Sequence, residues 1–231
     1  MKGMTRILAV MMFIPVLGCR QEPAELPSAE TLRIYLARHG QTDWNAERRL
    51  QGGTDTELNE TGRGQAAELA ARLDGIALDA VYSSQLRRSR DTAQVVAGES
   101  GVVSLAELNE QQLGEFEGAY LDGRDPQAVA EFERRSADPT DTMGGGESIE
   151  QHLARVEQAL ELIRGRHPSG RILIVGHGGT NAQILRALLG LSAQEAGEIG
   201  QSNSELYLIE LSPGRDPRLW KHIPSENLDE L

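Results

Sequence analysis

The chain has 231 residues, of which 39% are hydrophobic and 25% charged, and this composition excludes a disordered chain and a polytopic membrane protein. Its 23 Lys and Arg residues against 35 Asp and Glu residues give a net charge of −12. A surface that acidic repels a phosphate backbone, so we expect no nucleic-acid partner. The single cysteine, Cys19, excludes an internal disulfide framework and a cysteine-based zinc site.

The N-terminus is typical of a signal peptide, because a basic start precedes the apolar run Ile7–Leu17 and the small residue Gly18. The run is shorter than the roughly 20 residues that span a bilayer. The ending Val16-Leu17-Gly18-Cys19 resembles the bacterial lipobox, in which the cysteine is lipidated and becomes the mature N-terminus. This resemblance predicts a lipid anchor on Cys19 at the periplasmic side of the cell envelope. Arg20 in place of Asp favours the outer membrane, and the alternative is an ordinary secreted protein.

The chain divides into three parts. Residues 1–18 form the predicted signal peptide, and residues 19–31, which are polar with two prolines, form a flexible tether. Residues 32–231 contain no second linker and no internal repeat, so they predict one folded domain.

Hydrophobic periodicity predicts alternating strands and helices within this domain. In chain order, we expect a strand at 32–36, a helix at 66–73 that Asn59 would cap, a strand at 79–82, a helix at 149–163, a strand at 172–175, a helix at 184–189 and a strand at 206–211. Strands separated by helices favour an α/β fold, a three-layer α/β/α sandwich around a mostly parallel sheet.

Three of the predicted strands end in residues suited to an anion. The first ends at Arg38-His39, the second leads to Arg87-Arg88, and the third ends at His177. Ligands of open α/β sheets bind outside the carboxyl ends of the strands, and helix starts there offer free backbone N–H groups. If these strands are neighbours, the pattern predicts a phosphate site.

The segment Arg38–Asn45 resembles the signature of the histidine phosphatase superfamily, in its phosphoglycerate mutase-like branch. Further segments match that family in the same order, and the resemblance spans nearly the whole mature chain, from Leu32 to about Leu211. They are Leu50–Asp55 with Leu58–Gly62, Ser83–Ala93, Leu108–Gly118 and Gly176–Gly179. A lone Arg-His-Gly sequence would be weak evidence, whereas this ordered series is specific.

The resemblance implies a role for each matching residue. His39 would be the nucleophile that forms a phosphohistidine. Arg38, Arg88 and His177 would be catalytic residues that also bind the phosphate. Glu110 would be the general acid, a role that needs a raised pKa in the first half-reaction, and would then activate water. Asn45, Gln51 and Gly52 would contact the substrate, and the resemblance implies neither a metal nor an organic cofactor.

Some residues keep alternative interpretations. The family spacing favours Arg88 over Arg87 as the phosphate ligand, and Gly52 with Gly53 could simply form a turn. Arg134 and Arg135 could hold a substrate carboxylate or lie on a solvated helix face. The histidines outside all motifs are expected at the surface; they are His152, His167 and His222.

The resemblance favours a metal-independent phosphoric monoester hydrolase with a small phosphorylated substrate. One alternative is a cofactor-dependent phosphoglycerate mutase, and another is an inactive lipoprotein that binds an anionic ligand. The short gap between Gly118 and Glu147, the Gly178-Gly179-Thr180 sequence after His177 and a periplasmic location favour the hydrolase. Arg134-Arg135 favours the mutase, because mutases of the family carry a similar double-arginine segment.

Overall fold

A computed structural model describes residues 30–222 and 228–230. These residues contain a seven-stranded sheet in the order β3-β2-β4-β1-β5-β6-β7. β3, β2, β4 and β1 run parallel, whereas β5, β6 and β7 pair antiparallel. The strands are β1 Leu32–Arg38, β2 Ala80–Ser84, β3 Val103–Leu105, β4 Gly170–Gly176, β5 Leu206–Leu211, β6 Arg218–His222 and β7 Leu228–Glu230. Three of the five pairings among β1–β6 are parallel, so the expected mostly parallel sheet is confirmed.

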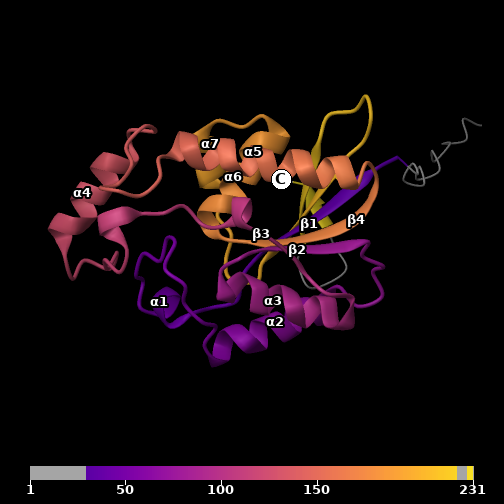
Figure 1. The fold of residues 1–231 in the computed structure, drawn as a ribbon, viewed down its shortest axis with the longest axis horizontal. Helices are drawn as coiled ribbons and strands as arrows, with labels where there is room; N and C mark the ends of the chain where they lie inside the picture. Colours follow the sequence, from indigo (N-terminus) through magenta and orange to yellow (C-terminus); the bar gives the residue numbers. More distant parts are fainter. Residues whose placement is uncertain (1–29, 223–227, 231) are drawn as a thin grey trace, which may run out of the picture.

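Helices cover both faces of the sheet (Figure 1). α2 and α3 pack on one face and α5 and α6 on the other, while α4 lies beyond one end of the sheet. The helices are α1 Asp43–Ala46, α2 Glu60–Arg72, α3 Arg87–Ala97, α4 Pro126–Ser136, α5 Ile149–Arg166, α6 Gly178–Leu189 and α7 Ala193–Glu198, with short 3₁₀ turns at Gly98–Ser100, Ala106–Leu108 and Gly114–Phe116. This arrangement confirms the predicted three-layer sandwich.

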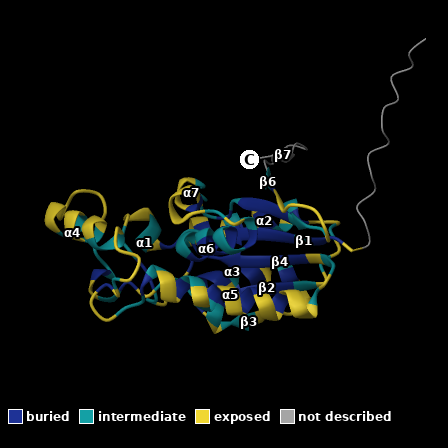
Figure 2. Cartoon of the chain, turned by 90° about the horizontal axis from the view of Figure 1, so that it is seen from above, coloured by how far each residue is buried: buried dark blue, intermediate teal, exposed yellow. Residues whose placement is uncertain are grey.

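The sheet is buried between two apolar clusters, which Figure 2 shows as the dark interior of the molecule. Alternate residues of β1 point to opposite faces, because side chains alternate along a strand. Ile34 and Leu36 pack with Val156 of α5 and Ile184 of α6, whereas Tyr35 packs with the cluster that contains residues of α2 and α3. The two-sided burial explains why β1 and β4 contain almost continuous apolar runs.

The starts of two predicted helices differ in how well the sequence marks them. Asn59 caps α2, as expected, and its side chain accepts a hydrogen bond from the backbone N–H of Gly62, so α2 begins at Glu60. α6 begins at Gly178, before the predicted 184, because its first turns are not strongly apolar. The strands β3, β6 and β7 and the helices α1, α3, α4 and α7 were not predicted. In α3 the apolar period is broken by buried polar residues, among them Arg88, Ser89 and Thr92.

The N-terminal predictions fall largely on residues that the structure does not describe. The signal peptide, Cys19 and the tether up to residue 29 lie outside the described ranges. Thr31, just before the predicted start of the domain at residue 32, contacts the domain: its backbone carbonyl accepts a hydrogen bond from Gly170 and its side chain contacts Ser212. Within residues 30–222 and 228–230, every helix is too short or too polar to cross a membrane.

Candidate active site

The three predicted strand ends meet at one edge of the sheet. β4 lies between β1 and β2, with Arg38 paired to Gly176 and Ser83 paired to Val175. The strands that carry the predicted residues are therefore neighbours, as the phosphate-site interpretation requires. His39 follows β1 directly, and its backbone N–H donates to the Gly176 carbonyl at 3.1 Å.

His39 is buried, with 2% of its surface exposed. Its Nδ1 lies 2.7 Å from the carbonyl oxygen of Gly40, which can only accept a hydrogen bond, so Nδ1 carries the proton and Nε2 keeps the lone pair. Burial and the guanidinium groups of Arg88 and Arg38 hold the pKa of His39 well below its usual 6.5. The ring is therefore neutral and nucleophilic at neutral pH.

Arg88 and Arg87 are adjacent in sequence but lie in different environments. Arg88 is 1% exposed, and its Nη1 and Nη2 donate to the carbonyls of Thr54 at 2.7 Å and Gly52 at 2.8 Å. Burial lowers the pKa of Arg88 to about 10, so the group stays charged at neutral pH. The Arg87 side chain is 46% exposed and pairs with Glu57. The structure thus places Arg88, as expected from the motif, at the site.

Arg38 is held by a loop that lies far along the chain. Its Nη1 donates to the carbonyl of Gln201 at 2.7 Å. Gln201 is itself fixed, because its amide nitrogen donates to the carbonyls of Leu36 and Glu205. Burial lowers the pKa of Arg38, and Glu110 opposes that shift. Sequence reasoning missed the role of Gln201, since no motif marks it.

His177 lies against His39, with the two ring centroids 5.1 Å apart. Its Nε2 is 2.7 Å from the hydroxyl of Ser84, which also accepts a hydrogen bond from the backbone N–H of Leu86. Burial and the charge of Arg88 hold the pKa of His177 well below 6.5. Ser84 therefore fixes the ring orientation and directs the other nitrogen, Nδ1, away from itself.

Three buried side-chain nitrogens at this edge have no hydrogen-bond partner among the described residues. They are the Nε atoms of Arg38 and Arg88 and the Nδ1 atom of His177. Buried polar groups are almost always paired, so unpaired donors on two guanidinium groups fit an anion that accepts from them. The donor set matches a phosphoryl group.

The Glu110 carboxylate lies at the N-terminus of α6, although Glu110 itself belongs to a loop far from α6 in sequence. Its carboxylate accepts hydrogen bonds from the backbone N–H groups of Gly179 at 2.9 Å, Thr180 at 3.0 Å and Gln111 at 3.0 Å. Burial raises the pKa of Glu110, but the backbone N–H donors and the charge of Arg88 lower it, and the pKa lies below its usual value. The raised pKa that the acid role needs in the first half-reaction is therefore absent from the free protein. The helix donors stabilise the carboxylate.

The histidines outside the motifs differ from one another. The surface prediction for His152 is wrong: the side chain is 0% exposed and its Nε2 lies 3.2 Å from the Thr180 hydroxyl. It is buried because its position on α5 faces α6, on which Thr180 lies. His167 is half-buried and contacts the Tyr82 hydroxyl at 3.0 Å, away from the site. The side chain of His222 lies outside the described part of the chain.

Asn45 and Gln51 each have an oxygen that is occupied by donors. Asn45 Oδ1 accepts from the backbone N–H of Thr42 and, at 3.3 Å, from the side-chain amide of Asn203. Gln51 Oε1 accepts from the hydroxyls of Thr42 at 2.9 Å and Thr56 at 2.5 Å. Each amide nitrogen is then oriented as a donor toward other groups. Asn203, which sequence reasoning missed, also donates to the His39 carbonyl at 2.9 Å.

Gly52 belongs to a turn, as its alternative interpretation proposed. The N–H of Thr54 donates to the Gln51 carbonyl at 3.0 Å, and Gly52 has a φ of +52°. A Cβ atom at Gly52 would lie 2.5 Å from Glu117 Oε1, so glycine is required on both grounds. Its carbonyl is a partner of Arg88, which connects the turn to the site.

Arg134 and Arg135 are both paired with acidic residues of the domain. Arg134 lies on α4 and binds Glu131 at 2.7 Å. Arg135 binds Asp141 at 2.6 Å and also pairs with Glu115. Arg135 is 16% exposed and is held by two carboxylates, whereas Arg134 is 67% exposed and lies on a solvated face of α4, which agrees with its alternative interpretation.

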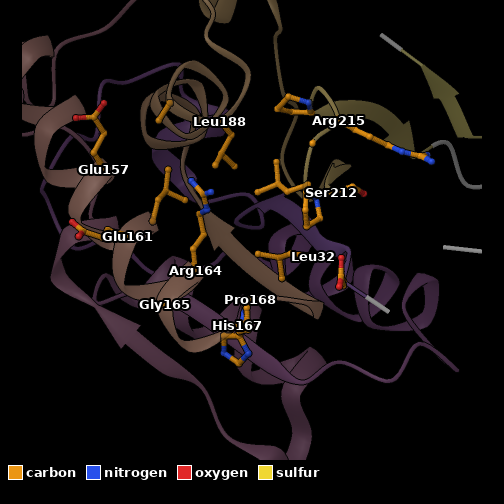
Figure 3. A pocket seen from close by; sticks show the side chains of 17 residues that line it. Leu32, Glu157, Glu161, Arg164, Gly165, His167, Pro168, Leu188, Ser212 and Arg215 are labelled. Carbon is orange, nitrogen blue, oxygen red and sulfur yellow. The ribbon is translucent and has the colours of Figure 1, made fainter. Parts of the chain in front are cut away.

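A separate depression of about 870 Å³ lies at the amino-terminal end of β1 (Figure 3). Leu32, Arg164, His167 and Leu188 are among its lining residues, and it contains none of the predicted site residues. Among the residues that the structure describes, no group of three or more His, Cys, Asp or Glu side chains is placed to hold a metal ion.

Comparison with known proteins agrees with this geometry. Residues 34–221 match the histidine phosphatase superfamily (branch 1). A metal-independent phosphoserine phosphatase of Arabidopsis thaliana is 38% identical over 167 residues, which is 69% of this chain and 68% of that protein. A probable phosphoglycerate mutase of Shigella boydii is 32% identical over 217 residues, 87% of this chain and 99% of that protein.

A solved structure resembles the fold as well. The mycobacterial glucosyl-3-phosphoglycerate phosphatase superposes with a TM-score of 0.69 at 31% identity, over 82% of this chain and 97% of that chain. The match to the family extends over more than half of the chain and includes every strand end described above. The chain therefore belongs to the histidine phosphatase superfamily, in branch 1.

Proposed function

We propose that this protein, a phosphatase of the histidine phosphatase superfamily, hydrolyses small phosphomonoesters through a phosphohistidine on His39. The observation that carries the proposal is the orientation of His39. Its Nδ1–H is held by the Gly40 carbonyl, which leaves the Nε2 lone pair next to the charges of Arg38 and Arg88. The names of similar proteins, phosphoserine phosphatase and glucosyl-3-phosphoglycerate phosphatase, support this reaction class.

The reaction would proceed in two steps. The Nε2 atom of His39 forms a bond to phosphorus while the bond between phosphorus and the ester oxygen breaks, and Glu110 donates a proton to that oxygen. Arg38, Arg88 and His177 stabilise the charge on the transferring phosphoryl group. Glu110 then takes a proton from water, whose oxygen attacks phosphorus and releases phosphate and free His39.

The proton on Glu110 needs a source, since the free carboxyl is ionised. Its neighbours are mainly N–H donors that favour the charged form. An incoming phosphate ester places negative charge beside the carboxylate, and a like charge raises a carboxyl pKa. Substrate binding would thus raise the pKa of Glu110, so that the carboxyl takes up the proton that the leaving oxygen requires.

Hydrolysis is favoured over mutase activity by the state of Arg134 and Arg135. Both arginines were the sequence feature in favour of a mutase, but Arg135 is held by Asp141 and Glu115, and Arg134 lies on a solvated helix face beside Glu131. We expect free phosphate to form faster than 2-phosphoglycerate when the protein receives 3-phosphoglycerate with 2,3-bisphosphoglycerate.

We also expect EDTA to leave hydrolysis of a panel of phosphosugars, nucleotides and phosphoamino acids unchanged. Isomerisation in tenfold excess over phosphate release, or loss of activity in EDTA that added metal restores, would contradict the proposal.

We also propose that lipid on Cys19 anchors the domain at the periplasmic side of the envelope, with the outer membrane favoured. The support is the lipobox-like Val16-Leu17-Gly18-Cys19 and the absence of Asp after it. Several acyl chains give stable anchoring, whereas a single chain gives marginal binding. In a bacterial host, Cys19→Ala should abolish fatty-acid labelling and release the protein from the membrane fraction. Equal labelling of this variant and the unaltered protein would exclude the anchor.

A further inference from the structure

His152 is a buried ionisable group that the proposed chemistry does not use. It lies on α5 with 0% of its surface exposed, and its Nε2 contacts the Thr180 hydroxyl, which in turn contacts Glu110. We propose that His152 is a positioning residue for the general acid, acting on Glu110 through the hydroxyl of Thr180. This inference rests on the proposed function, in which Glu110 protonates the leaving group.

The hydrogen-bond partners of Thr180 determine which atom is the donor in its contact with His152. Its Oγ1 lies 3.0 Å from the carbonyl of Asn109 and 3.1 Å from Glu110 Oε1, and both of these oxygens can only accept while the carboxyl is ionised. The single hydroxyl proton goes to one of them, so a lone pair of Oγ1 remains for His152. His152 Nε2–H is therefore the donor, and the buried Nδ1 atom, which has no partner among the described residues, carries no proton.

This arrangement lets the Thr180 hydroxyl follow the protonation state of Glu110. The backbone donors from Gly179, Thr180 and Gln111 are fixed, whereas the hydroxyl can turn between Glu110 Oε1 and the Asn109 carbonyl. When Glu110 is ionised, the Thr180 hydroxyl donates its hydrogen bond to the carboxylate. When Glu110 is protonated, the hydroxyl can donate to the Asn109 carbonyl instead. His152 holds the Thr180 oxygen in place in both states.

His152 acts in this position as a neutral donor. The charged or titratable groups that influence its pKa are Glu110, Glu147 in the segment before α5, and Arg155 on α5 itself, and His177 lies nearby. Burial dominates and lowers the pKa of His152. Because the proposed role needs an N–H group and not a charge, glutamine should replace histidine and leucine should not.

The experiment uses the full chain and compares two classes of ester. The phenolate of 4-nitrophenyl phosphate leaves without help from an acid, whereas an alkyl phosphate needs a proton on its leaving oxygen. kcat/KM reports the steps up to the phosphoenzyme, so it isolates the step in which Glu110 acts as an acid. The variants are His152→Leu, His152→Gln and Glu110→Gln, with His167→Gln as a matched control outside the site.

We expect His152→Leu to lower kcat/KM about 10-fold for the best alkyl phosphate in the panel and about 2-fold or less for 4-nitrophenyl phosphate. His152→Gln should recover most of the loss, and His167→Gln should behave like the unaltered protein. Glu110→Gln should show the same dependence on the leaving group with a larger loss, roughly 10²-fold or more for the alkyl ester.

Equal losses on both esters in His152→Leu would indicate a purely structural role and would overturn the inference. Failure of His152→Gln to recover activity, while its thermal unfolding is unchanged, would overturn it as well. If Glu110→Gln depends on the leaving group and neither His152 variant does, only the inference about His152 fails. If Glu110→Gln loses no more activity on the alkyl ester than on the aryl ester, the acid role of Glu110 fails, and the inference fails with it.

Discussion

His39→Ala is expected to lower kcat by roughly 10⁶-fold, which is the order of loss seen when a catalytic nucleophile is removed. Alanine has no nitrogen that could form the bond to phosphorus, and the remaining arginines can only bind the phosphoryl group. The matched control is His167→Ala, because His167 is half-buried and contacts Tyr82 away from the site. That control should retain full kcat. A His39→Ala protein within about tenfold of normal activity would show that another group attacks phosphorus.

The pKa of His39 also determines how kcat/KM depends on pH. Burial, Arg88 and Arg38 lower the pKa of His39, so the nucleophile stays neutral when the pH falls through its usual 6.5. After correction for titration of the substrate phosphate, the decline of kcat/KM that protonation of His39 causes should therefore lie below pH 6.5. A pH profile that falls with an apparent pKa near 6.5, measured at constant ionic strength, would contradict the neutral, buried ring that the structure describes.

Arg88→Ala is the second change with a large expected effect. Arg88 is fully buried, and its guanidinium is oriented by the carbonyls of Gly52 and Thr54. A fixed donor of this kind contributes about 2.7–4 kcal/mol to a charged transition state, so kcat should fall on the order of 10²–10³-fold. Arg88→Lys should recover only part of the loss, because lysine has no planar fork that could contact both carbonyls and a phosphoryl oxygen.

Arg87→Ala is the control for that experiment. It removes the same charge from the neighbouring position, where the side chain is half-exposed and pairs with Glu57. Exposed ion pairs contribute little to stability, so neither kcat nor thermal unfolding should change appreciably. Steady-state kinetics on 4-nitrophenyl phosphate measure both variants. Similar losses in Arg87→Ala and Arg88→Ala would mean that net charge, not the buried guanidinium, matters.

The strand ends could be predicted from the sequence because apolar strand patterns are followed there by arginine and histidine residues suited to binding an anion. The apolar runs at 34–37 and 172–175 are buried on both faces of the sheet, and such strands are parallel neighbours in α/β folds. Arg38, His39 and His177 follow those runs immediately, so their meeting at one edge follows from topology. α3 was missed for the opposite reason: Arg88 and Thr92 interrupt its apolar period.

The environment of Glu110 could not be predicted, since its partners lie about 70 residues further along the chain, at Gly179 and Thr180. Gln201 and Asn203 were missed because a polar turn before a strand has no distinctive signal. His152 is a different case. It lies three residues after Ile149 and four before Val156, on the apolar stripe of α5, so its burial could have been read from helical spacing.

The most direct test of the central claim is to trap the phosphoenzyme. The unaltered protein and His39→Ala would be mixed with a phosphomonoester and quenched within milliseconds, and the peptides would be mapped by mass spectrometry. We predict a phosphoryl group on His39 that is stable in base and lost in acid, and that is absent from His39→Ala. A phosphoryl group on a serine, threonine or carboxylate side chain, or one that persists in His39→Ala, would contradict the account.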